Sequence, residues 1–360
     1  MKKSIISLAL VLILALLTGC AGTPVVYYSD CTCPTGAHTG IAPVASTPDE
    51  TTAEAQGAVK TGTAIVASAA ESKSAGDADG EAKYDVSVVA VTVDDKGVIE
   101  SCVIDSIGTS VLFDVSGAIV SDLTAPIQTK NELGDSYNMK LYGGAVAEWY
   151  EQAAALASFA EGKTVEELRA GAVDETGHAA DADLATTATI YLGGYVSAIE
   201  KAVANARHLG AKAGDELKLA ILSSADGSAS ADAENAGLCE LHTSVAAVTV
   251  NGGVITSCQI DAVQAKVNFD TTGTITTDLT APIQTKNELG EDYGMKAWGG
   301  AIAEWNEQAA SFAAYITGKT ADEVAGIAVD ETTKPTDADL LTSVTIKIGD
   351  FQSLIAKAAN

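Results

Sequence analysis

The chain has 360 residues and a formal net charge of −27, with 48 Asp and Glu residues against 21 Lys and Arg. A surface this acidic repels the phosphates of nucleic acids and of anionic lipid headgroups, so we exclude nucleic acid as a partner. Apolar residues make up 47% of the chain and aromatic residues only 5%, which predicts a core of small aliphatic side chains with few aromatic centres.

The N-terminus has the pattern of a bacterial lipoprotein signal. Lys2 and Lys3 precede the apolar run Ile5 to Leu17, which is shorter than the roughly 20 residues that a membrane span needs. The letters Leu-Thr-Gly-Cys that end at Cys20 match a lipobox. We therefore predict that residues 1–19 are a signal peptide and that Cys20 carries the lipid. The anchor would hold the chain at the outer face of the cytoplasmic membrane or at the cell surface. The alternative is an ordinary secretory signal with a chance Cys.

The segment after Cys20, up to residue 56, is rich in Thr, Pro, Gly and Ala and is predicted to be a disordered tether. Cys31 and Cys33 lie in it. Their spacing fits neither a disulfide framework nor a zinc site, so we interpret them as loose thiols, with a surface metal or redox role as the alternative. We predict no metal-binding residues.

The rest of the chain contains one long internal repeat. The sequence DLTAPIQTKNELG at Asp122 to Gly134 recurs letter for letter at Asp278 to Gly290. A repeat of this length indicates a duplicated domain and not a solenoid. We place the first copy at 57–206 and the second copy at 214–360, joined by a link at 207–213. Each copy is expected to fold by itself.

Each copy is expected to contain a β-hairpin near its start. In the first copy the alternating runs 86–93 and 98–105 flank a turn at Asp95-Lys96-Gly97. In the second copy the turn is Asn251-Gly252-Gly253.

Two cysteines occupy matching places in these hairpins. Cys102 and Cys258 lie on the apolar face of the second strand, which predicts buried, unreactive thiols. Cys239 should lie opposite residues near 264, so a disulfide with Cys258 is disfavoured.

Apolar residues at steps of three and four predict a long helix that starts at Val146 in the first copy and at Ile302 in the second. The helices should end near Gly162 and Gly318. Capping boxes predict a short second helix in each copy, at Thr164 to Glu167 and at Thr320 to Glu323.

The end of each copy is expected to form a strand and a final amphipathic helix. The strands are predicted at 187–192 and 343–348, and the helices from Tyr195 and Phe351. This order of elements predicts an α+β fold of two tandem homologous domains, each a mainly antiparallel sheet packed with helices.

Signatures of common enzymes are missing from the sequence. It has no GxSxG, HExxH or Walker loop, and none of its 4 histidines recurs between the copies. An ordinary hydrolase or NTPase is therefore disfavoured, and we assign no catalytic residue.

One polar segment is almost unchanged between the copies. It reads TKNELGDSYNMK at Thr129 to Lys140 and TKNELGEDYGMK at Thr285 to Lys296. It could be a ligand rim in which Lys130 or Lys286 meets a phosphate. It could equally be a structural loop spared since a recent duplication.

A second segment precedes the final helix and reads DLATTAT in the first copy and DLLTSVT in the second. It is similar to the motif D-x-x-[ST]-G-A-[ST] of the FMN-binding domain of bacterial membrane electron-transfer proteins. That family includes flavin-carrying subunits of sodium-pumping quinone reductases and surface lipoproteins of extracellular electron transfer. The matching positions are Asp183, Thr186 and Thr189 in the first copy, and Asp339, Thr342 and Thr345 in the second.

The resemblance implies FMN as a cofactor, bonded through its phosphate to the last hydroxyl residue, Thr189 or Thr345. Asp183 would help to present the motif to a flavin transferase. Two departures count against covalent attachment, most of all in the second copy: Thr187 stands where the family has Gly, and Ser343-Val344 where it has Gly-Ala. Non-covalent FMN, or none, stays open.

Together these features predict a surface-tethered flavin electron carrier, which would relay electrons between a membrane redox donor and an outside acceptor. The alternative is a non-enzymatic binding or adhesion lipoprotein that kept the fold and lost the flavin. A solute-binding component of a transporter fits less well, because each copy closes on itself.

Overall fold

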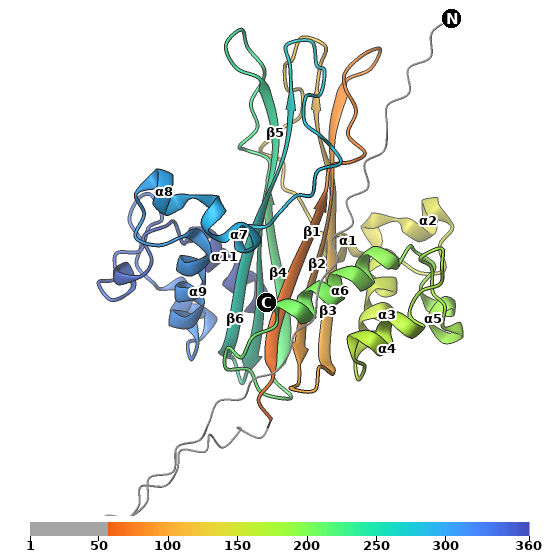
Figure 1. The fold of residues 1–360 in the computed structure, drawn as a ribbon, viewed down its shortest axis with the longest axis vertical. Coiled ribbons are helices and arrows are strands. Elements are labelled where there is room, and N and C mark those ends of the chain that lie inside the picture. The colour runs from red at the N-terminus through yellow and green to blue at the C-terminus, as the bar shows by residue number, and fades with distance from the viewer. Residues whose placement is uncertain (1–56, 360) are drawn as a thin grey trace, which may run out of the picture. The chain divides into compact units, whose positions relative to one another are not determined.

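The computed structural model describes residues 57–359, so the predicted signal peptide, Cys20 and the tether lie outside the described residues. The described part has two three-stranded antiparallel sheets, one from each copy, with helices beside them (Figure 1). This confirms the predicted α+β fold. No helix between residues 57 and 359 is long and apolar enough to cross a membrane.

Both sheets have consecutive strands as neighbours. The first consists of β1 (Lys60–Ser68), β2 (Gly80–Val93) and β3 (Ile99–Phe113). The second consists of β4 (Glu216–Ser224), β5 (Gly237–Asn251) and β6 (Val254–Phe269). The predicted hairpins are therefore confirmed as β2–β3 and β5–β6, and both are longer than expected.

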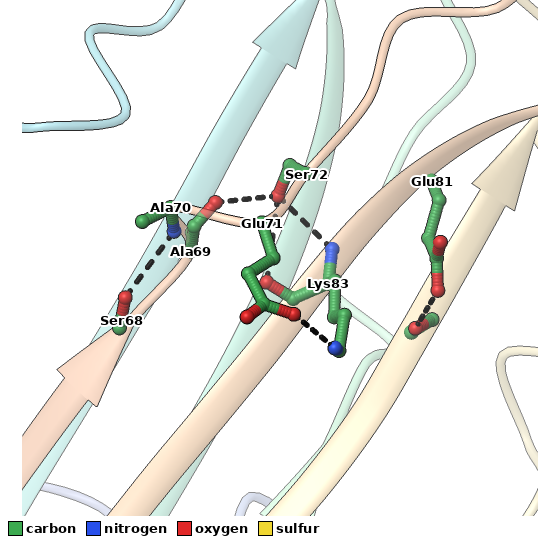
Figure 2. Close-up of polar contacts among 8 residues, drawn as sticks. Ser68, Ala69, Ala70, Glu71, Ser72, Glu81 and Lys83 are labelled. Atoms are coloured by element: carbon green, nitrogen blue, oxygen red, sulfur yellow. Dashed lines mark hydrogen bonds and ion pairs between the residues drawn. The ribbon is translucent and has the colours of Figure 1, made fainter.

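The connection between β1 and β2 is held against β2 by Ser72 and Lys83 (Figure 2). The Ser72 hydroxyl donates to the Ala69 carbonyl at 2.7 Å and accepts from the Lys83 amide at 3.0 Å. The Lys83 ammonium also pairs with the Glu71 carboxylate. These contacts fix the path of the chain where it leaves the edge strand.

The helices of the two copies follow the same order. The first copy has α1 (Lys130–Leu133), a 3-10 turn η1 (Gly134–Tyr137), α2 (Met139–Gly143), α3 (Trp149–Ala160), α4 (Val165–Gly171), α5 (Ala182–Thr187) and α6 (Gly193–Asn205). The second has α7 (Lys286–Leu289), η2 (Gly290–Tyr293), α8 (Met295–Gly299), α9 (Trp305–Ile316), α10 (Ala321–Ala325), η3 (Leu340–Thr342) and α11 (Gly349–Ala359).

The long helices start later than the apolar spacing predicts. Glu148 and Glu304 are the N-caps of α3 and α9, and each forms a capping box with the Glu three residues on. Val146 and Ile302 therefore lie outside the helices, and they are 56% and 54% exposed. The two capping boxes predicted from the sequence are confirmed at Thr164 and Thr320.

The strands predicted at 187–192 and 343–348 are wrong. The Asp181 carboxylate accepts from the amides of Asp183 and Leu184 and starts α5, which runs to Thr187. Asp337 does the same before η3. These helical turns end at Thr187 and Thr342, and the chain beyond them pairs with no strand of residues 57–359. The amides of Thr189 and Ile190 donate to the Gln152 side chain, and those of Thr345 and Ile346 to the Gln308 side chain.

The two sheets pack against each other, and the helices cover their outer faces (Figure 1). Alternate residues of β2 serve the two layers. Val89 and Val91 belong to the core between sheet and helices, while Val86 and Val88 belong to a core that both sheets share. The copies therefore form one continuous body within the described residues.

Phe113 and Phe269 meet in this shared core, where β3 and β6 end. Their rings stack with centroids 4.1 Å apart and an interplanar angle of 10°. Gly80 and Gly237 lie directly beside the rings, where a Cβ would come within 2.3 Å and 2.2 Å of ring carbons. Only glycine fits at these two positions.

The described cysteines are all free and buried. Cys239 pairs in register with Val267, away from Cys258, which confirms the prediction against a disulfide. Burial raises the pKa of the Cys258 thiol to about 12, and that of Cys102 rises for the same reason. Both behave as small apolar residues.

Candidate functional site

In the second copy, Asn287 and Glu288 of the repeated polar loop make specific contacts with the surrounding structure. The Asn287 side-chain amide donates to the Ile260 carbonyl at 2.9 Å, and its backbone amide donates to the Asp261 carboxylate at 3.1 Å. Glu288 pairs at 2.8 Å with Lys201 of α6, which belongs to the first copy. These contacts give the Asn and Glu positions a structural reason to be retained.

The first copy repeats this arrangement. Asn131 donates to the Ile104 carbonyl and to the Asp105 carboxylate, and Glu132 pairs at 2.7 Å with Lys357 of α11 in the second copy. Each final helix is thus tied to the polar loop of the other copy. These structural contacts account for the Asn and the Glu of the KNEL sequence but not for its lysine.

Lys286 is the exception in the second copy. It is 7% exposed, and its Nζ lies 5.1 Å and 4.9 Å from the ring centroids of Tyr293 and Trp305. The nearest polar partner is His242 Nε2 at 3.5 Å, and Lys286 forms no ion pair with any residue between 57 and 359. Burial lowers the pKa of Lys286 to about 8. Glu240, Asp261 and Asp350 lie near enough to oppose part of this shift, but none of them forms an ion pair with the ammonium.

Lys286 lines a cavity of about 510 Å³, within the size range of small-molecule sites. Its charged and polar lining includes His242, Lys286, Lys334, Thr345, Lys347 and Asp350, and Trp305 adds an aromatic ring. Two residues predicted from separate segments, Lys286 and Thr345, are therefore brought to one site. Asp339 and Thr342 do not line it.

Thr345 is held in place by a glutamine that the sequence reasoning missed. The backbone amide and hydroxyl of Thr345 donate to Gln308 Oε1 at 2.8 Å and 3.2 Å. Gln152 receives the same pair of bonds from Thr189 at 2.7 Å and 3.3 Å. Both glutamines are fully buried. The available signal was a polar residue at the same place on the apolar face of both long helices.

The remaining predicted residues make local contacts. The Thr186 hydroxyl donates to the Asp183 carbonyl at 2.7 Å, and the Thr342 hydroxyl to the Asp339 carbonyl at 2.6 Å. All four residues are exposed, as is Thr189. These threonine bonds are common at helix ends and need no ligand.

The departures from the family motif cause no backbone strain. Ser343 has a φ of −131°, and the described non-glycine residues with positive φ are only Asn138 and Thr333. The positions of Thr187 and Ser343 thus do not require glycine. Val344 is fully buried in the core of the second copy and does not line the cavity.

The counterpart of Lys286 in the first copy has a carboxylate beside it. Lys130 lies over the equivalent rings, 5.3 Å from Tyr137 and 5.2 Å from Trp149. Asp85 and Lys130 both border Gly108, within 3.7 Å and 3.8 Å of where a Cβ would lie. In the second copy the position of Asp85 is His242, so the local negative charge is lost.

The rim of the site also carries more positive charge in the second copy than in the first. In the first copy His178 and Tyr191 meet edge to face, with ring centroids 6.2 Å apart. The second copy has Lys334 and Lys347 at these positions, and both line the cavity. The second copy thus gathers three lysines and one carboxylate, Asp350, around the cavity, in a protein whose net charge is −27. This arrangement suits an anion.

Comparisons of the chain with models of known protein families, with curated proteins and with solved structures found no match. The resemblance to FMN-binding domains therefore rests on the short motifs alone and stays a prediction. What the site can bind must be argued from its own residues.

Proposed function

We propose that the second copy binds FMN in the cavity beside Lys286, and that the chain is an exported, lipid-anchored flavin electron carrier. The observation that carries this proposal is the buried ammonium of Lys286, which lies among aromatic rings and forms no ion pair with a carboxylate of residues 57–359. A phosphate would supply the missing counter-charge.

The residues around the cavity fit both ends of such a ligand. Lys286, Lys334 and Lys347 offer cations to a phosphate, while Trp305 and Phe351 offer apolar and aromatic surface to a ring system. Bound FMN would supply the electron-accepting and electron-donating chemistry. The protein's own part is to hold the phosphate, exclude water from the ring and set the charge around it.

This proposal moves the working site from the first copy to the second. The first copy has the better match to the covalent motif, but Thr189 is exposed and Asp85 lies near Lys130. Asp85 would repel a phosphate there. The second copy has the weaker motif but the more positive site.

A titration with FMN and riboflavin tests the proposal. FMN should bind the purified full chain and lose fluorescence or shift its absorbance, whereas riboflavin, which lacks the phosphate, should bind at least about tenfold more weakly. Equal binding of both would refute the phosphate contact. No binding of either, together with no flavin released on denaturation, would favour the non-enzymatic binding or adhesion lipoprotein.

Covalent attachment needs a separate test. After co-expression with a flavin transferase, intact-mass measurement would report an FMN adduct, and Thr189→Ala and Thr345→Ala would identify its position. An adduct lost only in Thr345→Ala would agree with the second-copy site. An adduct lost only in Thr189→Ala would place the flavin in the first copy and contradict this assignment.

A further inference from the structure

A second cavity, of about 720 Å³, lies where the two copies join. The link contributes Arg207 and Leu209, β6 contributes Gln259 and Ile260, and α9 contributes Asn306. It shares no lining residue with the cavity beside Lys286. Any ligand it takes is therefore distinct from the proposed flavin.

Two side chains of this junction cavity have unmet hydrogen-bonding capacity. The carboxamide oxygens of Gln259 and Asn306 are buried and have no hydrogen-bond partner. Among the buried side-chain nitrogen and oxygen atoms of the described residues, only these two lack one. A buried acceptor left unpaired costs free energy of folding, so native proteins rarely keep one without a reason. Both residues line the cavity.

The fold itself does not require these carboxamides. At the equivalent positions the first copy has Val103 and Tyr150 in place of Gln259 and Asn306. The same β3 and α3 framework forms there without either amide. The carboxamides are thus a property of the junction in the second copy.

The charged groups of the cavity come from different elements. The acidic residues Asp261 and Glu288 line it from β6 and α7 and add acceptor oxygens to the two amides. The link adds Arg207, whose guanidinium donates to the carbonyls of Ala204 and Ala206. Arg207 forms no ion pair with any residue from 57 to 359.

We propose that the junction cavity binds a small zwitterion, namely a short peptide or an amino acid. Its ammonium would donate to the carboxamide oxygens of Gln259 and Asn306, which would turn toward it, and its carboxylate would pair with Arg207. The ammonium suits the acceptor-rich side, and a carboxylate is the natural partner of an unpaired guanidinium. The small side chains Ala310, Ala313 and Ala314 leave room for the apolar part of the ligand.

Calorimetric titration of the purified full chain with L-alanyl-L-alanine tests this proposal. The dipeptide should bind, and N-acetyl-L-alanine methylamide, which carries neither charge, should not. Gln259→Val introduces the residue of the first copy and should weaken binding by about tenfold or more, the scale of one hydrogen bond to a charged group. Arg207→Gln should do the same.

Lys286→Met is the matched control, because it changes the other cavity, and it should leave dipeptide binding intact. Circular dichroism would check that the variants fold, and Asn306→Leu provides a second test of the amide wall. No binding of the dipeptide would overturn the proposal. So would equal binding of the blocked peptide, or dipeptide binding that all three cavity variants leave unchanged.

Discussion

The side chain of Lys286 is buried among Tyr293, Trp305 and His242 and has no carboxylate within ion-pairing distance. Its equivalent, Lys130, has the same aromatic neighbours but is only half-buried. The same position of the repeat thus has two environments in one chain. A substitution at Lys130 is therefore an internal control for the same substitution at Lys286.

Replacing Lys286 by Met should stabilise the chain at neutral pH. Burial lowers the pKa of Lys286 to about 8 in the folded state, against 10.5 for a lysine in water, so its protonated form opposes folding. The gain should be at most roughly 3 kcal/mol below pH 8 and should vanish as the pH rises toward 10.5. Denaturant unfolding at several pH values would measure it.

Lys130→Met is the comparison for this experiment. A half-exposed lysine keeps much of its hydration, so its replacement should change the free energy of unfolding far less. A gain of the same size and pH dependence in both variants would contradict the special burial of Lys286.

At the scale of elements, the hairpins could be predicted because alternation and turn residues are local signals. The late start of α3 could not be predicted from apolar spacing. That spacing shows which residues face the core, whereas the start of the helix is set by the capping box of Glu148. The expected strand at 187–192 failed because the amides of Thr189 and Ile190 donate to the buried Gln152 side chain and not to a neighbouring strand, which local sequence does not show. The packing of the two sheets had a sequence signal that was missed. Residues 88–91 of β2 are a continuous apolar run, Val-Val-Ala-Val, which is typical of a strand covered on both faces, and all four are buried.

The candidate site was predicted in part. Lys286 was identified because its loop repeats in the other copy, and Thr345 because its segment resembles the motif of FMN-binding domains. Lys334 and Lys347 were missed because they do not repeat and because only the tertiary fold brings them to the cavity. Differences between the copies were as informative here as identities.

Thr333 is an element-scale feature that should cost stability. It has a φ of 63°, which is unfavourable for a β-branched residue, and its counterpart Gly177 has a φ of 79°. Thr333→Gly should raise the free energy of unfolding by about 1 kcal/mol. The relief of backbone strain stabilises the folded state, and the greater conformational entropy that glycine loses on folding offsets part of this gain. Asn138→Gly is the control, since Asn tolerates its φ of 58° and should gain less. A loss of stability in Thr333→Gly would contradict this account.

At the scale of the whole molecule, the two copies share one core between their sheets. Val86, Val88 and Phe113 of the first copy pack in the same cluster as Val263 and Phe269 of the second. The duplication therefore produced two similar halves that cover one another's apolar faces.

Separately produced halves, 57–206 and 214–360, should associate when mixed. Each would otherwise expose the apolar sheet face that the shared core buries, and the hydrophobic effect favours its removal from water. Light scattering and denaturant unfolding would measure the complex and its stability. Halves that stay monomeric and unfold as cooperatively as the full chain would instead support fully independent domains.

Membrane attachment should depend on Cys20. Cys20→Ala should abolish lipid labelling and leave soluble or uncleaved precursor, because the lipobox cysteine is the predicted acyl acceptor. Metabolic labelling with a fatty acid, followed by fractionation, would test this. Undiminished labelling of the variant would refute the assignment.

Equilibrium binding of FMN to Lys286→Met and Lys130→Met, beside the unaltered chain, tests the central claim most directly. The account predicts that Lys286→Met weakens binding by about tenfold or more, the scale of a lost hydrogen bond between charged groups, while Lys130→Met leaves it unchanged. Binding that survives Lys286→Met, or that is lost only in Lys130→Met, would contradict the proposal that the second copy holds the flavin.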